Sequence, residues 1–143
     1  KSLDDKDALV DMYIRGIDFC LEHDYPSNDF IRENFKGVME KHGVFLDDAI
    51  ALQDQSKCIA LGTTNGKVTA TGYSVSEVWA KHDSALNIVA KDNAFVMVDV
   101  YDNAVVNVIA SDRAKVCVNH HGGKVIQKAT GDAVVKIREM SNK

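Results

Sequence analysis

Three consecutive stretches decide the fold of this chain: DNAFVMV at residues 92–98, DNAVVNV at 102–108 and DRAKVCV at 112–118. In each, a turn-forming aspartate is followed by an alanine and then by valines at every second position. Because successive side chains of a strand point to opposite faces, the alanine and both valines lie on one face. Valine is β-branched and favours the crowded, pleated surface of a sheet. Each stretch therefore predicts one short strand whose inner face is small and apolar.

The same pattern continues in both directions and makes nine modules of nine or ten residues between Ser56 and the C-terminus. The first position is always alanine, glycine or serine, and the third and fifth are small or apolar except at Asn87 and Gln127. The modules begin at Ser56, Gly66, Ser76, Ala85, Ala94, Ala104, Ala114, Gly123 and Ala133. A fixed period of this kind indicates a repeat architecture in which neighbouring modules share one core.

Two architectures can be built from such modules. In an antiparallel β-meander, consecutive modules pair as hairpins, whose tight turns favour Asn-Gly or glycine at set positions. The turns here instead end in Asp-Asn, Asp-Ser or Asp-Arg before alanine. In a parallel β-solenoid, two modules make one coil of roughly 20 residues, and like residues stack about 4.8 Å apart. We predict the parallel β-solenoid and keep the antiparallel β-meander as the alternative.

The N-terminal part of the chain carries a helical pattern instead. Over residues 4–23, apolar residues recur at three- and four-residue steps, as in one stripe of an amphipathic helix. Pro26 interrupts this helix, and Ser27 is a suitable N-cap for a second helix over residues 28–42. Residues 44–55 predict a short extended piece and a turn.

We therefore predict two regions, a helical hairpin or cap at 1–55 and the β-solenoid at 56–143. The helices can either cover a face of the solenoid or cap the open end of its first coil, where unpaired strand edges need protection.

The repeat resembles the alanine- and valine-rich solenoid repeats of the form D/G-N-A-x-V-x-A/V found in many uncharacterised bacterial and bacteriophage proteins. The resemblance is close over residues 83–118, looser over 56–82 and 119–137, and does not include the helical part. It implies a β-solenoid fold and a bacterial or phage origin, and it implies no activity and no functional residue.

Charge is divided unevenly between the two regions. Residues 1–55 hold 6 basic and 13 acidic side chains, a net −7, whereas residues 56–143 hold 11 basic and 8 acidic side chains, a net +3. Nucleic-acid binding depends on neutralising phosphates, so the acidic region argues against that partner. No apolar run approaches the roughly 20 residues that span a bilayer, which argues against a membrane protein.

The three cysteines, Cys20, Cys58 and Cys117, are an odd and sparse set. We interpret them as free thiols in a reducing compartment, because disulfide frameworks are normally even and denser. The expected localisation is cytoplasmic, or virion-associated for a phage protein. The chain begins at Lys1 without a methionine, so secretion with processing is not excluded.

Positions two and four of each module point outward in a two-sided solenoid. On one side, position four gives Trp79 and Met97 in a column with Ile59 and Cys117, and Phe95 lies beside them. Contiguous exposed apolar patches usually mark contacts. The column can be covered by the helices, can bind a protein partner or a second copy, or can form a carbohydrate platform centred on Trp79.

On the other side, the alignment makes Leu86 and Ile88 the large outward residues of the module that begins at Ala85. The candidate ligand or partner surface therefore comprises Trp79, Phe95, Met97, Leu86 and Ile88.

Two groups of side chains have metal-binding chemistry, and each has a simpler interpretation. Aspartates recur before the small residue of four modules, as in calcium-binding solenoids, but the glycines that those turns require are missing. These aspartates are Asp83, Asp92, Asp102 and Asp112. Turn formation is the favoured interpretation for them. His120 and His121 lie near Cys117, but adjacent histidines point to opposite sides of an extended chain, so a solvated turn is favoured over zinc.

No nucleophile motif, phosphate loop or nucleotide fingerprint occurs, and modules of nine or ten residues leave no long loop for a cleft. We predict no catalytic residue, metal or cofactor. The favoured function is a non-enzymatic structural or protein-interaction module that self-associates. A carbohydrate- or protein-binding module that uses a flat solenoid face is the alternative, and a polysaccharide-acting β-helix enzyme is the third.

Overall fold

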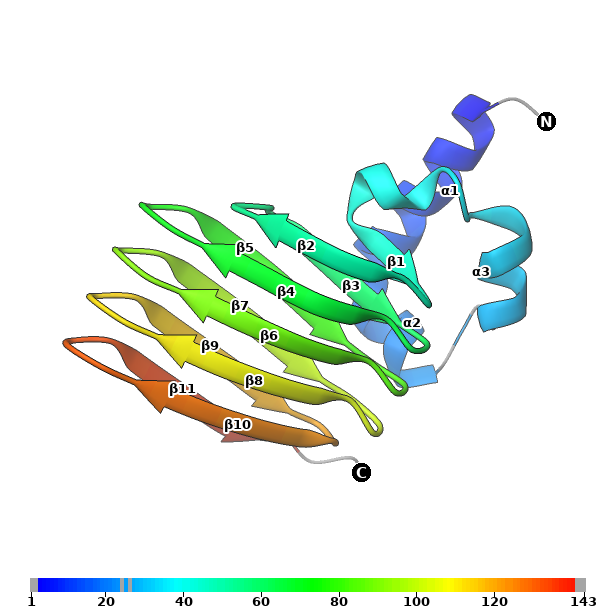
Figure 1. The fold of residues 1–143 in the computed structure, drawn as a ribbon. Helices are drawn as coiled ribbons and strands as arrows, with labels where there is room; N and C mark the ends of the chain where they lie inside the picture. Colours follow the sequence, from blue (N-terminus) through cyan, green and yellow to red (C-terminus); the bar gives the residue numbers. More distant parts are fainter. Residues whose placement is uncertain (1–2, 24, 26, 141–143) are drawn as a thin grey trace.

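The computed structural model describes the backbone of residues 3–23, 25 and 27–140, and the side chains of these residues from Ala8 onward. Within these residues, eleven strands wind into a parallel β-solenoid, with a helical segment at its N-terminal end (Figure 1). The strands are β1 (Val44–Leu46), β2 (Ala49–Gln53), β3 (Lys57–Leu61), β4 (Asn65–Ala70), β5 (Val75–Ala80), β6 (Ala85–Ala90), β7 (Phe95–Val100), β8 (Val105–Ala110), β9 (Lys115–His120), β10 (Lys124–Ala129) and β11 (Val134–Glu139).

The described strands form two parallel sheets. Sheet A has six strands in the order β1-β3-β5-β7-β9-β11, and sheet B has five in the order β10-β8-β6-β4-β2. Each strand pairs with the strand two places along the chain, so two consecutive strands make one coil. The predicted parallel β-solenoid is confirmed, and the antiparallel alternative is wrong.

Like residues stack on like residues inside the solenoid. In sheet A, Val96 pairs with Val116 and Val98 with Val118, and in sheet B, Ala90 pairs with Ala110. These columns lie in one core cluster in which most members are less than 3% exposed. The predicted thin core of alanine and valine is therefore present, and it holds the two sheets together.

The register corrects one predicted module. Leu86 pairs with Val106 and Ile88 with Val108, so both side chains point inward, and they are 2% and 0% exposed. The prediction that Leu86 and Ile88 form an outer surface is wrong. The module begins at Ser84 rather than at Ala85, and a shift of one residue moves every side chain to the other face.

The cause of this error lies in the turn before β6. The sequence alignment matched Asp83 with Asp92, since both precede a small residue. In the structure His82, with φ 62°, occupies the left-handed turn position that Asp92 occupies with φ 60°. The turn geometry, rather than the aspartate, therefore marks where each module begins.

The N-terminal segment contains α1 (Leu3–Arg15), α2 (Ile17–His23), α3 (Asn28–Asn34) and the 3-10 helix η1 (Met39–His42). The first predicted helix is divided at Gly16, and the second ends at Asn34, before its predicted end. The predicted break at Pro26 lies outside the described residues. Ser27 caps α3 as expected, since its hydroxyl accepts from the Phe30 N–H at 3.2 Å.

The solenoid begins earlier than the predicted boundary between residues 55 and 56. β1 pairs with β3, and β2 pairs with β4, so residues 44–53 already form most of the first coil. The short extended piece and turn predicted for residues 44–55 are present, but a second strand and the pairing with the solenoid were not predicted, because this segment lacks the pattern of a small residue and alternating valines. The inward side chains of β1 and β2, Phe45 and Ile50, are larger and close the N-terminal end of the core, where they are 8% and 9% exposed.

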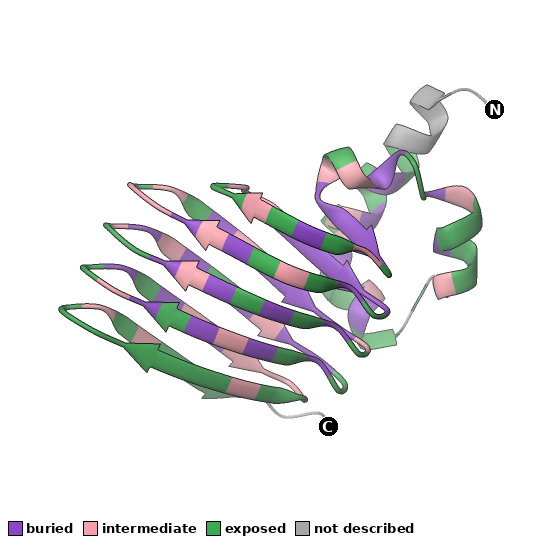
Figure 2. Cartoon of the chain, in the orientation of Figure 1, coloured by how far each residue is buried: buried purple, intermediate pink, exposed green. Residues whose placement is uncertain are grey.

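The helices cover the outer face of sheet A near its N-terminal end. They form a second core with outward residues of that sheet, separate from the interior of the solenoid. Its members from the helical segment are Val10, Tyr13, Ile17, Leu21, Ile31, Phe35, Val38 and Met39, and those from the sheet are Val44, Leu46, Ile59, Leu61, Trp79 and Tyr101. Figure 2 shows the resulting concentration of buried residues around the first coils.

Candidate interaction surfaces

Trp79 lies beneath the helices and is 6% exposed. Its Nε1–H donates to Oδ1 of Asp18 in α2 at 3.3 Å, and the Lys57 ammonium lies 5.6 Å from the ring centroid. The expectation that Trp79 is part of an outer ligand surface is therefore wrong for this residue. The Trp79 ring instead holds α2 against sheet A. Covering by the helices was one of the alternatives predicted for the column that contains Trp79.

A polar cluster that the sequence analysis did not identify lies beside Trp79. Tyr101 stacks on His121, with ring centroids 4.2 Å apart and planes within 8°, and Nε2 of His121 lies 2.9 Å from Oδ1 of Asp99. Burial, together with the charges of Asp99, Asp18 and Glu22, raises the pKa of the Tyr101 hydroxyl. Tyr101 therefore stays protonated, and the cluster joins the ends of β7 and β9 through the ring stack and the contact between His121 and Asp99.

An ion pair lies next to this cluster. The Lys81 ammonium, just after β5, lies 2.8 Å from Oδ2 of Asp102 and 5.6 Å from the centroid of the Tyr101 ring. The Lys81 side chain is 5% exposed, so this charge is nearly desolvated and depends on its carboxylate partner. Trp79 and Tyr101 pack against the helical segment, and the Lys81–Asp102 pair joins two neighbouring coils beside them.

The rest of the outer face of sheet A stays exposed. We call its apolar part the uncovered patch, which consists of Val75, Phe95, Met97 and Cys117, with the charged residues Glu77 and Lys115 beside them. Val75 pairs with Phe95, and Met97 pairs with Cys117, so the apolar side chains adjoin across strands. Val75 is 60% and Met97 36% exposed. Of the five predicted surface residues, Phe95 and Met97 are placed where the sequence analysis expected them.

The outer face of sheet B has a different character. Its exposed large apolar residues are spread over two strands, with Val105 and Ile109 on β8 and Ile126 on β10. Between them Asn107 donates through Nδ2 to Oδ1 of Asn87 at 3.3 Å, one step of an amide ladder along the stack. This face is flat and mixed rather than apolar.

The aspartates at the corners bond the neighbouring coil. Oδ2 of Asp92 accepts from the Gly72 N–H at 2.9 Å, and Oδ2 of Asp112 accepts from the Asp92 N–H at 3.2 Å. Asp92, Asp102 and Asp112 all adopt positive φ. The turn interpretation therefore holds for these residues, and the carboxylates of Asp92 and Asp112 also bond the backbone of the preceding coil.

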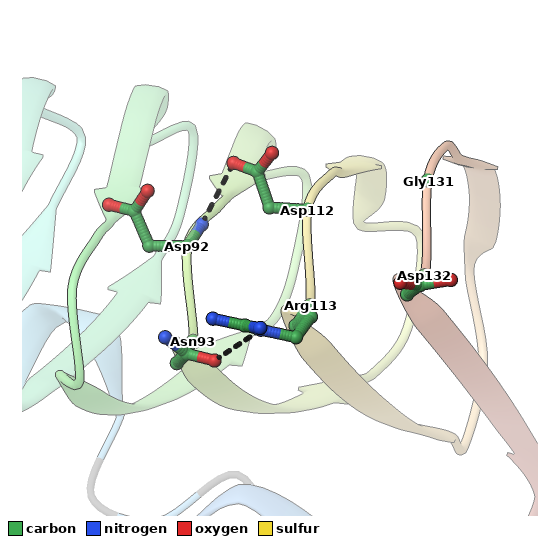
Figure 3. A pocket seen from close by; sticks show the side chains of 6 residues that line it. All are labelled: Asp92, Asn93, Asp112, Arg113, Gly131 and Asp132. Atoms are coloured by element: carbon green, nitrogen blue, oxygen red, sulfur yellow. Dashed lines mark hydrogen bonds between the residues drawn. The ribbon is translucent and has the colours of Figure 1, made fainter.

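A shallow hollow of about 450 Å³ lies at this corner, lined by Asp92, Asn93, Asp112, Arg113, Gly131 and Asp132 (Figure 3). Across it, Nε of Arg113 donates to Oδ1 of Asn93 at 3.0 Å. The side chains of the hollow thus bond to one another and to the backbone, which strengthens the stacking of the coils.

The adjacent histidines point to opposite sides, as expected, but neither lies in a solvated turn. His120 contacts Oε1 of Glu139 through Nδ1 at 2.8 Å and the carbonyl of Gly123 through Nε2 at 2.9 Å, whereas His121 is stacked on Tyr101. Each therefore has a structural role that depends on residues about 20 positions away.

All three cysteines are free thiols. Burial raises the pKa of the Cys58 thiol to about 12, while Cys117 lies partly exposed in the uncovered patch. Cys117 is thus the accessible thiol of the two solenoid cysteines.

None of the described helices is long and apolar enough to cross a membrane. Fold and surfaces together define a parallel β-solenoid with a helical segment packed on one outer face. Comparison with models of protein families, with curated proteins and with solved structures finds no match.

Proposed function

We propose that the chain is a non-enzymatic structural or protein-interaction module that self-associates through the uncovered patch of sheet A. The observation that supports this proposal is the division of the sheet's outer face. One part buries Trp79, Tyr101 and their neighbours beneath the helices, and the adjoining part has Val75 and Met97 exposed and Phe95 partly exposed. An exposed apolar patch beside a covered one is typical of a contact surface.

The regular stacking of the coils also supports this role. The paired strands hold the patch residues at fixed spacings, and a rigid surface loses little conformational freedom on binding. The resemblance of the repeat to solenoids of bacterial and phage proteins supports a setting in such an organism.

A protein partner is favoured over a carbohydrate because the ring that would have stacked on a sugar, that of Trp79, is 6% exposed and bonded to Asp18. Catalysis is not favoured because the His121–Asp99 pair is stacked beneath Tyr101 and bonded internally.

The test is the solution mass of a double variant, Phe95→Lys with Met97→Lys, measured by sedimentation equilibrium over a range of concentrations. Both side chains point outward, so the variant should fold and show at least a tenfold weaker association. The matched control is Val105→Lys with Ile109→Lys, which places the same charges on the outer face of sheet B and should associate like the wild type. A wild-type chain that stays monomeric throughout, or a patch variant that associates unchanged, overturns the proposal.

A further inference from the structure

The two sheets end in four strands, β1 and β2 at the N-terminal end and β10 and β11 at the C-terminal end. Among the described strands, each of these four pairs on one side only. An open strand edge can pair with another chain, and proteins protect such edges with charged side chains or with a covering segment. The four edges of this solenoid differ in how they are protected.

Three edges are protected. β10 carries the exposed lysines Lys124 and Lys128, and β11 carries Lys136 and Arg138. The helical segment protects β1, because the ammonium of Lys36 donates to the carbonyl of Leu46 at 2.6 Å.

β2 has no such protection within its own bounds, Ala49–Gln53. Its sequence, AIALQ, contains no charge and no proline. Ala49, Ala51 and Gln53 are exposed, while Ile50 points into the solenoid. Figure 1 shows β2 at one edge of its sheet, with β10 at the opposite edge.

The backbone of β2 is also oriented for pairing. The Asn65 N–H donates to the carbonyl of Asp48 at 2.9 Å, and the Asp54 N–H donates to the carbonyl of Thr69 at 2.8 Å. Even-numbered residues thus bond to β4, and the alternation of peptide groups along a strand directs those of Ala49, Ala51 and Gln53 to the open side.

We infer that β2 pairs antiparallel with β2 of a second copy of this chain, about a two-fold axis at Ala51. In this register Ala51 meets the second copy's Ala51, and Ala49 meets its Gln53. The outward N–H and C=O groups of all three residues then bond across the interface. Sheet B would run continuously through the dimer.

The side chains fit a second copy of the same strand. The outer positions hold two alanines and an uncharged glutamine, so no bulky or charged side chain of β2 opposes the strand spacing of about 4.8 Å. On the inner side Ile50 would meet the second copy's Leu52, which covers the N-terminal opening of the core. Pairing of two copies through their C-terminal edges would instead bring basic side chains of the two chains together, and the repulsion of like charges disfavours it. These side chains are Lys124, Lys128, Lys136 and Arg138.

The ends of the paired segment are set by two acids. Asp48 would face the second copy's Asp54, and like charges do not favour pairing beyond this point. Both acids have partners within the chain, because Asp48 lies 3.1 Å from the Lys36 ammonium and Asp54 accepts from the Thr71 N–H at 2.7 Å. The dimer is therefore confined to residues 49–53. It depends on backbone groups, unlike the association through the uncovered patch.

The experiment uses the full chain carrying Phe95→Lys and Met97→Lys, so that the uncovered patch does not contribute. To this background we add Ala51→Lys, which gives β2 the kind of charge that protects β10. The matched control adds Ala85→Lys, an exposed alanine on the same outer face, in a strand that pairs on both sides. Solution mass and amide hydrogen exchange are measured from about 1 μM to 1 mM.

We expect the background and the Ala85→Lys chain to dimerise, with amide exchange at Ala51 slowed at least tenfold as concentration rises. The Ala51→Lys chain should stay monomeric, with its other amides unchanged. A background chain that is monomeric with rapid Ala51 exchange throughout overturns the inference, and the proposed function still stands if the wild type associates. Equal dimerisation of both lysine variants also overturns it.

Discussion

The two ends of the solenoid share one backbone pattern and differ in the side chains at equivalent interior positions. One interior column runs from Phe45 through Ala60, Ala80 and Val100 to His120 and Glu139. It begins with a ring that is 8% exposed and ends with a carboxylate that is 75% exposed. A large apolar side chain thus closes the N-terminal coil, whereas the C-terminal coil ends in polar groups. Figure 2 shows the corresponding change from buried to exposed residues along the solenoid.

This difference shows that the repeat determines the path of the chain, while single side chains at equivalent positions determine how each end behaves. Stability in a repeat array depends mainly on contacts with neighbouring coils. Substitutions should therefore cost far more at the N-terminal end than at equivalent sites of the last coil.

The largest contrast is expected between two glycines. A Cβ at Gly66 would lie 1.9 Å from the carbonyl oxygen of Ile50, and φ there is +145°. Gly66→Ala should therefore separate β2 from β4 and cost about 4 kcal/mol or more of unfolding free energy. At Gly131 the nearest atom would be 3.3 Å away and φ is +63°, so Gly131→Ala should cost only about 1–2 kcal/mol.

Urea denaturation of both glycine variants and of the wild type gives these free energies. Equal losses at the two sites would contradict the contrast between the ends.

A smaller contrast is expected between two isoleucines that both point inward. Ile50 is 9% exposed in the first coil, and Ile137 is 38% exposed in the last. Ile50→Ala should cost about 2–4 kcal/mol of unfolding free energy, because it opens a cavity in a closed end. Ile137→Ala should cost less than about 1 kcal/mol, since much of the side chain is already in water.

Ile88→Ala, at a site with 0% exposure in the middle of the array, provides the reference for a fully buried position. If the Ile137 variant loses as much stability as the Ile88 variant, the last coil is packed more tightly than its exposure indicates.

The smallest effects are expected from pH, and they run in opposite directions at the two ends. The N–H of Thr63 and the guanidinium of Arg32 lower the pKa of Asp47 from its ordinary 3.8, and the N–H of Thr71 lowers that of Asp54. A lowered pKa stabilises the folded state fully above 3.8 and loses that contribution as pH falls through the folded value. Acid should therefore loosen the N-terminal corners first.

At the C-terminal end, the carbonyl of Gly123 and the carboxylate of Glu139 raise the pKa of His120 above its ordinary 6.5. This contribution is complete below pH 6.5 and is lost as pH rises through the folded value. The His120 contact is partly exposed, so the loss should stay below about 1 kcal/mol. Mild alkali should therefore loosen the last coil.

Amide protection factors, corrected for intrinsic exchange, follow both ends in one titration. The amides of Thr63 and Thr71 report the N-terminal corners, and that of Met140, which donates to the carbonyl of His120, reports the last coil. Glu139→Gln should reduce the alkaline loss and leave the acid response unchanged. Loss of protection at both ends in the same direction of pH would contradict this assignment.

The candidate surface was predictable only in part. The two-residue period of DNAFVMV correctly placed Phe95 and Met97 outside. The same reasoning failed at Leu86 and Ile88 because Ser84 and Ala85 are both small, and nothing local decides which one begins the module. Only the left-handed turn at His82 and the pairing of β6 with β8 settle that choice.

The sequence by itself determined the parallel β-solenoid, its approximate period and its core of alanine and valine, because these follow from the alternation of side chains along a strand. The tertiary structure decided that the helices cover sheet A, that Trp79 is buried and that Tyr101 stacks on His121. These contacts join residues 20 to 61 positions apart, as Tyr101 with His121 and Asp18 with Trp79 show. No local pattern specifies such pairs, because they arise only when separate elements compete to bury the same apolar face.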